Sequence, residues 1–338
     1  MDSLGKGIID LTGDSDGDAQ QQIASVSASA QAGEHEEHSG KEESKKSDKK
    51  KKARIKRISA FFRDKASHRH ISSRFQLSRL RDIPTNGQSV ILANPATQHI
   101  GTTLLDRGWA CGYRNCQMLL SSVLSGAKNV SDKDAEQRLD ETIPSVRKLQ
   151  EMLEMAWSEG YDADGAQQLG YRVFGTRKWI GTTEIYCILA HMGVRSGIVD
   201  FHCPTAPDGS HSALFSWIFD YFTDGQTNAA IGDVLAVQPA EGDVSVRFVA
   251  KHPLYLQHQG HSRTVIGVEM GESGISLLVF DPDVDPGPGD RLSVFRYTLF
   301  STRGVGQYQV LYVDQKDEDD SRQSTSDIPK QISSRRIP

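Results

Sequence analysis

The chain has 338 residues, of which 37% are hydrophobic, so it is long enough for one large domain or two small ones. Its 39 basic and 44 acidic residues give a formal net charge of -5, which offers no overall attraction to nucleic acid. No apolar run reaches the about eighteen residues of a transmembrane helix, and the polar N-terminus is unlike a secretory signal. The 4 cysteines form neither a disulfide framework nor a CxxC zinc pair. We therefore expect an intracellular protein with reduced thiols and no metal or cofactor.

The two ends of the chain have the composition of disordered segments. Residues 1–70 are rich in Gly, Ser, Gln and charged residues, so they cannot bury enough apolar surface to offset the entropy of ordering. Residues 316–338 have the same character and are predicted to form a second disordered tail. Residues 71–315 hold all four Trp and all four Cys, and their number suits one domain.

The predicted elements of that domain follow one another along the chain. Apolar residues at helical spacing predict a helix that begins near Cys111 and ends at Gly126. A second helix follows Pro144, and Thr182–Met192 is a third. Three later runs rich in β-branched and aromatic residues are predicted strands: Ser262–Glu269, Ile275–Phe280 and Tyr308–Val313. Helices followed by strands favour the α+β class over a doubly wound parallel sheet.

Cys111 is the candidate nucleophile. It stands at the start of the strongest predicted helix, where unpaired amide groups and the helix dipole favour an anion and so lower the pKa of a thiol. A lone cysteine is more often a packed core residue. The apolar stripe of the helix passes through Cys116, however, and Cys111 lies about 140° away around the helix. We therefore assign Cys116 to the core and Cys111 to chemistry.

Among the 11 histidines, His261 is the candidate base for that thiol. It opens a predicted strand, and the next strand ends at Asp281. A hairpin centred on Gly271 would place these two residues directly opposite each other, roughly 4.5–5.5 Å apart on one face. A catalytic thiolate requires an imidazole that a carboxylate or amide orients. A metal site at His258 and His261 lacks a supporting acidic or cysteine cluster.

Five blocks of sequence together resemble one family: RGWACGYRNCQMLLSS around Cys111, GTRKWIGTTEI at 175–185, GHSRTVIGVE at 260–269, LLVFDPD at 277–283 and QYQVL at 307–311. They look like the papain-like cysteine peptidases that group ubiquitin-fold-modifier-specific proteases with a zinc-finger-bearing deubiquitinase. This resemblance implies a papain-like α+β fold whose helical part is followed by an antiparallel sheet. It also implies Cys111 as nucleophile, His261 as general base and Asp281 as the residue that orients the base.

Where the chain departs from the family pattern, it resembles the deubiquitinase branch. In proteases for the ubiquitin-fold modifier and for the autophagy modifier, the histidine follows the aspartate in Asp-Pro-His, whereas residue 283 here is Asp. No cysteine precedes Cys111, so the zinc fingers of that deubiquitinase have no counterpart. The resemblance implies a cysteine-type deubiquitinase that hydrolyses the bond after the C-terminal glycine of ubiquitin or polyubiquitin. The alternatives are a protease for either of the other two modifiers, or an inactive ubiquitin-binding adaptor.

The resemblance also suggests residues around the nucleophile. Gln98 is the candidate donor to the oxyanion, with His99 in reserve, because the family places this donor upstream of the nucleophile. Asp162 and Glu184 fall in blocks similar to the family's substrate-facing segments, where carboxylates would meet the arginines of the ubiquitin tail. Ordinary surface acids are the alternative for both residues. Trp179 would either wall the substrate channel or belong to the core, and we favour the core.

The N-terminal arm carries two further motifs. Its apolar string resembles a SUMO-interacting motif, which adds a strand to the edge of SUMO's sheet; the residues are Ile8, Ile9, Asp10 and Leu11. The basic run of residues 45–57 predicts nuclear import first and a nucleic-acid contact second. We therefore expect the protein in the nucleus and the cytoplasm.

Overall fold

The computed structural model describes residues 74–82, 89–125, 143–225, 246–271, 274–285, 295–314 and 328–337. The helices are η1 (Leu77–Asp82), α2 (Cys111–Ser125), α4 (Val146–Ser158), α5 (Ala163–Gln168), α6 (Thr182–His191), α7 (Ser212–Thr223) and η3 (Leu299–Thr302). The strands are β1 (Arg74–Gln76), β2 (Ser89–Leu92), β3 (Gln98–Ile100), β4 (Ser196–Phe201), β5 (Val246–Phe248), β6 (Leu254–His258), β7 (His261–Gly271), β8 (Gly274–Phe280), β9 (Arg296–Thr298), β10 (Tyr308–Val313) and β11 (Ser334–Ile337).

A mainly antiparallel sheet with β7 at its centre organises the described residues. Within them it has nine strands in the order β11-β4-β10-β6-β7-β2-β5, and β8 and β9 continue it from β7. Strand β6 pairs with the first half of β7 and β2 with the second half, while β8 pairs along the other edge. Two pairs at the sheet margins, β11 with β4 and β2 with β5, are parallel. The α+β class is therefore confirmed.

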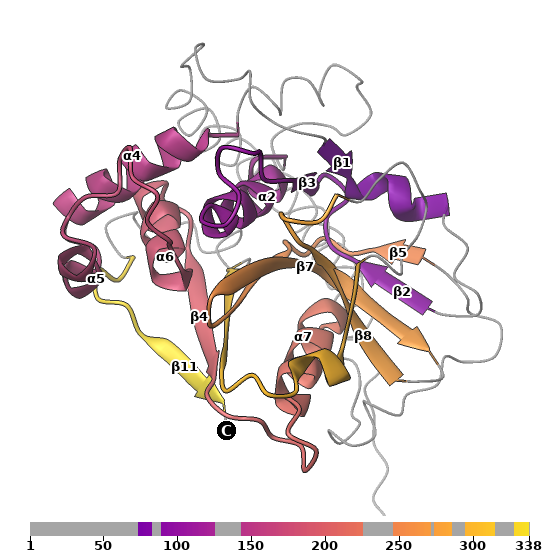
Figure 1. The fold of residues 1–338 in the computed structure, drawn as a ribbon. Coiled ribbons are helices and arrows are strands. Elements are labelled where there is room, and N and C mark those ends of the chain that lie inside the picture. The colour runs from indigo at the N-terminus through magenta and orange to yellow at the C-terminus, as the bar shows by residue number, and fades with distance from the viewer. Residues whose placement is uncertain are drawn as a thin grey trace, which may run out of the picture. The chain divides into compact units, whose positions relative to one another are not determined.

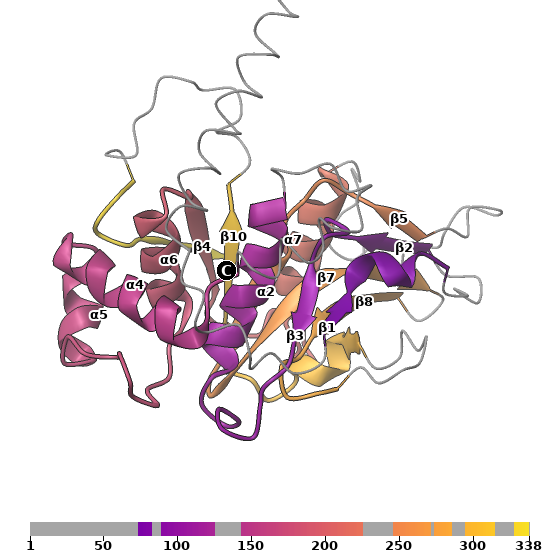
Figure 2. The same ribbon diagram turned by 90° about the horizontal axis from the view of Figure 1, so that it is seen from above.

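The helices form two groups around this sheet. Figures 1 and 2 show α4, α5 and α6 at one end, β2, β5, β7 and β8 at the other, and α2 between them. One apolar cluster joins α2, α4 and α6, and a second joins α7 to the strands around β7 and β8. Because α2 contributes buried side chains to both clusters, its position relative to the sheet is tightly fixed.

The three predicted helices and the three predicted strands are all present, with small shifts at their ends. The second helix begins after Ser145, whose hydroxyl accepts from the main-chain N–H of Lys148 at 3.2 Å, so Pro144 precedes the cap. The expected order of helices first and strands second is wrong, since β1, β2 and β3 precede α2 and α7 follows β4. Strands of three or four residues are too short for periodicity, and α7 is apolar on most of its circumference.

The predicted C-terminal tail needs correction at its far end. Residues 334–337 form β11, which pairs in parallel with β4. The side chains of this strand are mostly exposed, so its polar composition does not prevent main-chain pairing at a sheet edge. Residues 315–327 and 1–73 lie outside the described part of the chain. Within the described residues, no helix has the length and hydropathy that crossing a bilayer would require.

Gly267 lies where β7 changes partners, and it allows a close approach of two strands. The pairing of β7 with β8 shifts between Val265 and Gly267, and a Cβ at Gly267 would lie 2.1 Å from the carbonyl oxygen of Ile91 on β2. A contact that short requires the backbone to move. The glycine is therefore a steric requirement of the β2–β7 pairing.

We expect Gly267→Ala to lower the free energy of unfolding by about 1–3 kcal/mol, because the added methyl group overpacks a buried strand pair. Urea denaturation followed by circular dichroism measures this loss. Gly306→Ala is the matched control, since a Cβ there meets nothing within 4 Å, and we expect a change within about 0.5 kcal/mol. Equal stability of the two variants would contradict the steric argument.

Candidate active site

Cys111 is the first residue of α2 and is partly exposed, whereas Cys116 is fully buried. The loop before it is held by Asp106, which accepts from the main chain and hydroxyl of Thr103 and forms a buried ion pair with Arg114. Because Arg114 lies one turn after Cys111, this ion pair ties the loop to the helix it precedes. The thiol is thus fixed at a helix N-terminus, where the first N–H groups have no acceptor within the helix.

His261 is the first residue of β7 and closes the β6–β7 hairpin opposite His258. The two-residue turn contains Gly260 at φ +84, a conformation that glycine adopts without strain. The imidazole Nε2 lies 2.9 Å from Oδ2 of Asp281. The imidazole of His261 also lies beside the thiol of Cys111, since each of the two groups shifts the pKa of the other. Since Asp281 engages Nε2, Nδ1 is the ring nitrogen left for the thiol.

The hairpin register that we expected for His261 and Asp281 is wrong, although the two side chains do meet. Thr264 lies opposite Phe280, so the register places Arg263 rather than His261 opposite Asp281. The difference arises because Gly271 pairs with Gly274, so the hairpin is centred one and a half residues beyond Gly271, and the bulge between Val265 and Gly267 offsets only part of that shift. Diagonal neighbours on one face lie within reach of long side chains, and the imidazole spans that diagonal.

Asp281 holds two cationic partners at once. Its Oδ2 accepts from Nε2 of His261 and from Nε of Arg263, each at 2.9 Å, and its Oδ1 accepts from the main-chain N–H of Asp283 at 3.0 Å. Oxygen and nitrogen atoms of His261, Asp281 and Asp283 lie within 4.8 Å of one another, which is close enough for a cation. Arg263 already supplies positive charge to this carboxylate, and it donates to Nε2 of His258 at 3.1 Å. These contacts favour an orienting role over metal binding.

The pKa shifts match a thiolate paired with an imidazolium. Burial alone would raise the pKa of Cys111, but hydrogen bonds with His261 and Ser262 outweigh it and lower that pKa. The hydrogen bond with Asp281, and next that with Cys111, raise the pKa of His261 to about 9. Burial opposes the charge on Asp281, yet the contact with His261 leaves its pKa below the ordinary value. Together the three side chains favour the charged forms of all three groups.

Asn115 is a site residue that the sequence analysis missed. Its side-chain amide donates to the carbonyl oxygens of Cys111 and Ser262, each at 2.9 Å, and to Oγ of Ser262 at 3.0 Å. The hydroxyl of Thr264 donates to its Oδ1 at 2.7 Å. Asn115 is fully buried. Its spacing was a usable signal, because a buried amide four residues after Cys111 lies on the same side of the helix.

Gln98 lies on β3, and its main-chain N–H donates to Oγ of Ser121. Ser121 is ten residues beyond Cys111, which is about 15 Å along the helix axis. The buried His99 instead supports the acid, since its Nε2 lies 2.8 Å from the carbonyl oxygen of Asp281. Burial lowers the pKa of His99, so the ring is neutral and Nε2 carries its proton. These positions do not support either residue as the oxyanion donor.

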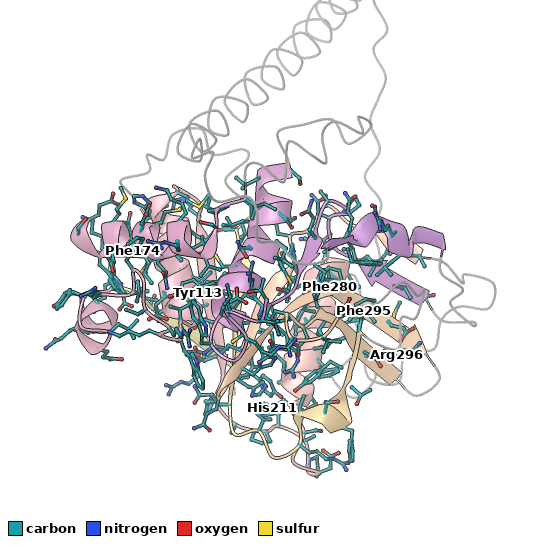
Figure 3. All side chains as sticks on the ribbon, turned by 45° about the horizontal axis from the view of Figure 1, so that its top comes forward. Tyr113, Phe174, His211, Phe280, Phe295 and Arg296 are labelled. Atoms are coloured by element: carbon teal, nitrogen blue, oxygen red, sulfur yellow. The ribbon has the colours of Figure 1, made fainter. Side chains whose placement is uncertain are left out.

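The ring of His99 also belongs to an aromatic group beneath the site. It packs edge-on against Phe280 with 5.2 Å between ring centroids, and Phe280 in turn packs against Phe295 at 5.5 Å. Figure 3 shows Phe280 and Phe295 side by side. Because Phe280 immediately precedes Asp281, this packing fixes the strand end that presents the carboxylate.

Asp162 and Glu184 both serve as helix caps. The side chain of Asp162 accepts from Gly165 at the start of α5, and Asp162 has a left-handed backbone with φ 45. Glu184 accepts from the main-chain N–H of Gly181 at 2.6 Å and from the hydroxyl of Thr183 at 3.0 Å. Helix capping already accounts for an acidic residue at each position, so a substrate contact is not needed to explain either one. A contact with a modifier tail stays a prediction for both residues.

Trp179 is not a core residue, contrary to our expectation. Its side chain is 58% exposed, and its indole N–H donates to the carbonyl oxygen of Gly108 at 3.1 Å. Gly108 belongs to the loop before Cys111, and the same loop exposes Leu104 and Leu105. The loop before the nucleophile therefore carries exposed apolar side chains, and the exposed Trp179 is hydrogen-bonded to that loop.

The predicted SUMO-interacting motif, with residues Ile8, Ile9, Asp10 and Leu11, lies outside the described residues. So does the basic run of residues 45–57. Binding to SUMO, nuclear import and contact with nucleic acid therefore stay predictions.

The chain is similar to several curated proteins. The zinc finger-containing ubiquitin peptidase 1 of Homo sapiens is 44% identical over 185 residues, which are 54% of this chain and 29% of that protein. The protein of the same name from Rattus norvegicus is 40% identical over 203 residues, or 60% of this chain and 32% of that protein. The chain thus spans about a third or less of the length of these relatives.

Two more distant proteins are also similar. Ubiquitin carboxyl-terminal hydrolase mug105 of Schizosaccharomyces pombe is 33% identical over 181 residues, which cover 54% of this chain and 62% of that protein. The crystal structure of UfSP from C. elegans aligns with 67% of this chain and 34% of that chain, at a TM-score of 0.39 and 15% identity.

A model of peptidase family C78 matches residues 86–303. The matched region contains Cys111, His261 and Asp281, the three side chains that the fold brings together. It covers more than half of the chain, so this protein belongs to peptidase family C78.

Proposed function

We propose that this chain is a cysteine isopeptidase that hydrolyses the bond after the C-terminal glycine of ubiquitin. The observation that carries the proposal is the contact of Cys111 with His261, itself bonded to Asp281 at 2.9 Å. The substrate is inferred from relatives of 40–44% identity that are named ubiquitin peptidases. The Asp at position 283, in place of a histidine, also supports ubiquitin over the other modifiers.

In the proposed reaction, the thiolate of Cys111 attacks the carbonyl carbon of the terminal glycine and forms a C–S bond. Imidazolium His261 gives its Nδ1 proton to the leaving amine as the C–N bond breaks, which leaves a thioester. Water then attacks the thioester, neutral His261 takes the proton of that water, and the C–S bond breaks to release the carboxylate. The main-chain N–H groups at the start of α2 would stabilise the oxyanion in both steps.

The first test offers the full chain a panel of probes with electrophilic C-termini, made from ubiquitin, SUMO, the ubiquitin-fold modifier and the autophagy modifier. We expect the ubiquitin probe to label the wild type and Cys203→Ser, and Cys111→Ala to remain unlabelled. Cys203 is the control because its thiol is exposed but lies outside the site. Labelling by the probe of another modifier alone would contradict ubiquitin as the substrate. Binding of ubiquitin without labelling would indicate an adaptor.

The second test uses pH. The pKa of His261 is raised to about 9, so its imidazolium, and the stability it contributes, are present at neutral pH and lost as the pH rises through about 9. We expect kcat/KM for a fluorogenic ubiquitin substrate to fall along an alkaline limb in that region. Asp281→Asn removes the charge that raises this pKa, so the limb should move to lower pH. An unmoved limb in Asp281→Asn would contradict the pairing, and the exposed Asp164→Asn is the control.

The third test concerns Trp179, which is exposed and hydrogen-bonded to the loop before the nucleophile. We expect Trp179→Ala to raise KM about tenfold or more with little change in kcat, because exposed tryptophans often dominate interfaces. Phe300→Ala, which removes another exposed ring on η3, should leave KM unchanged. A fall in kcat alone after Trp179→Ala would instead indicate that Trp179 positions the loop before Cys111.

A further inference from the structure

Arg263 lies on β7 two residues after His261, so the two side chains leave the strand on the same face. Its Nε forms an ion pair at 2.9 Å with Oδ2 of Asp281, the oxygen that His261 also contacts at 2.9 Å. The side chains of the three residues are only 14–22% exposed. Two cationic groups therefore share one carboxylate oxygen where little water is present to screen their charges.

A second contact of Arg263 fixes the protonation state of His258. Nη1 of Arg263 lies 3.1 Å from Nε2 of His258, and a guanidinium group can only donate. Nε2 must therefore be the unprotonated nitrogen of that ring. The ring proton then lies on Nδ1, which is 3.1 Å from the carbonyl oxygen of Gln259. Burial, and next the charge of Arg263, lower the pKa of His258, in agreement with a neutral ring.

Aromatic rings complete the surroundings of the guanidinium. Cζ of Arg263 lies 5.1 Å from the ring centroid of Tyr297. The hydroxyl of Tyr297 is hydrogen-bonded to that of Tyr308 at 2.7 Å, and Tyr308 packs edge-on against His258 with 5.7 Å between centroids. The planar guanidinium is thus held by a carboxylate, an imidazole and a phenol ring, so its charge stays fixed beside Asp281.

We propose that Arg263 is a positioning residue of this site, which shares the charge of Asp281 with His261 and so keeps the imidazolium able to give up its proton. The inference rests on the proposed pairing of Cys111 with His261 but not on ubiquitin as the substrate. The carboxylate stabilises the imidazolium, and a proton held too tightly does not pass to the leaving amine. The guanidinium opposes that effect by its charge on the same oxygen, and its Nε contact restricts the rotation of the carboxylate.

The charges around the imidazole determine the sign of the expected effect. The charged and titratable groups that face it within the described residues are Cys111 from α2, His258 from β6, Arg263 from β7, and Asp281 and Asp283 after β8. The contact with Asp281 outweighs burial and the charge of Arg263, so the pKa of His261 lies at about 9. Loss of the guanidinium removes a positive charge that does not titrate in this range, so it raises that pKa further.

Arg263→Met tests the proposal, because methionine fills much of the same space without the charge. NMR titration of the full chain with isotope-labelled histidine measures the pKa values, and His258→Gln and His261→Gln assign the signals. We expect the pKa of His261 to rise by about one unit, a tenfold change in proton affinity. The pKa of His258 should also rise, since the repulsion by Arg263 and the proton donated to Nε2 are both lost. Arg263→Lys, which keeps the charge, should restore most of the His261 value.

Alkylation of Cys111 by iodoacetamide gives a second readout. It is measured in a Cys203→Ser background, because Cys203 is exposed while Cys116 and Cys187 are buried. A thiolate paired with an imidazolium reacts in two steps as the pH rises, first when the thiol ionises and then when the imidazolium loses its proton. We expect Arg263→Met to move the upper step to higher pH by about one unit. A merely structural role would change the rate at every pH without moving that step.

Arg303→Met is the matched control. Arg303 also forms an ion pair with a carboxylate, that of Asp208, and also lies over an aromatic ring, at 4.6 Å from the centroid of Phe300. Its side chain and that of Asp208 are exposed, and the pair does not include a residue of the site. The same loss of charge should therefore leave both histidine pKa values and the upper alkylation step unchanged.

An unchanged or lowered pKa of His261 in folded Arg263→Met would overturn the proposal, as would an equal shift in Arg303→Met. An unchanged pKa of His258 in Arg263→Met would show that the guanidinium is not held as described, and would overturn it as well. Both readouts work without a modifier protein. A failure here is therefore distinguishable from a failure of the ubiquitin probe to label Cys111.

Discussion

The site depends on the hydrogen bonds that Asn115 makes between the nucleophile helix and the central strand. A helix and a sheet packed through apolar side chains alone can slide by fractions of an ångström at little cost, whereas a fully buried amide with unpaired protons is costly. The side chain of Asn115 meets the carbonyl oxygens of Cys111 and Ser262 and the hydroxyl of Thr264. Its geometry thus fixes the first turn of α2 against the first residues of β7, where sulfur and imidazole must meet.

The acid of the site is fixed by a different mechanism. Asp281 lies beyond the end of β8, so sheet pairing does not position it. Its main chain accepts from His99, and its carboxylate accepts from Arg263 as well as His261. Arg263 is itself held over the ring of Tyr297, at 5.1 Å from the ring centroid. A positive neighbour limits how far the carboxylate raises the pKa of His261, so the imidazolium can still release its proton during the reaction.

The sequence analysis predicted which side chains meet better than it predicted the fold around them. Cys111, His261 and Asp281 could be found because a helix start, a strand start and a strand end are local features that carry a signal. The register between β7 and β8 could not be predicted from the sequence. The bulge at Ile266 depends on the approach of β2 to Gly267, and β2 comes from another part of the chain. Trp179 was misjudged for a similar reason, because its exposure depends on Gly108, 71 residues away in the sequence.

The contacts of Asp162 and Glu184 affect how the tail of a modifier protein could be bound. Both carboxylate oxygens of Glu184 have partners at the start of α6, and the free oxygen of Asp162 is buried over the start of α5. The main-chain N–H of Asp162 also donates to the carbonyl oxygen of Lys330, so the C-terminal segment holds this turn in place. An arginine that bound this buried oxygen of Asp162 would require the turn to move. The exposed indole of Trp179 and the side chains of Leu104 and Leu105 require no such movement, so binding through the apolar parts of the tail costs the folded chain less than binding through its charges.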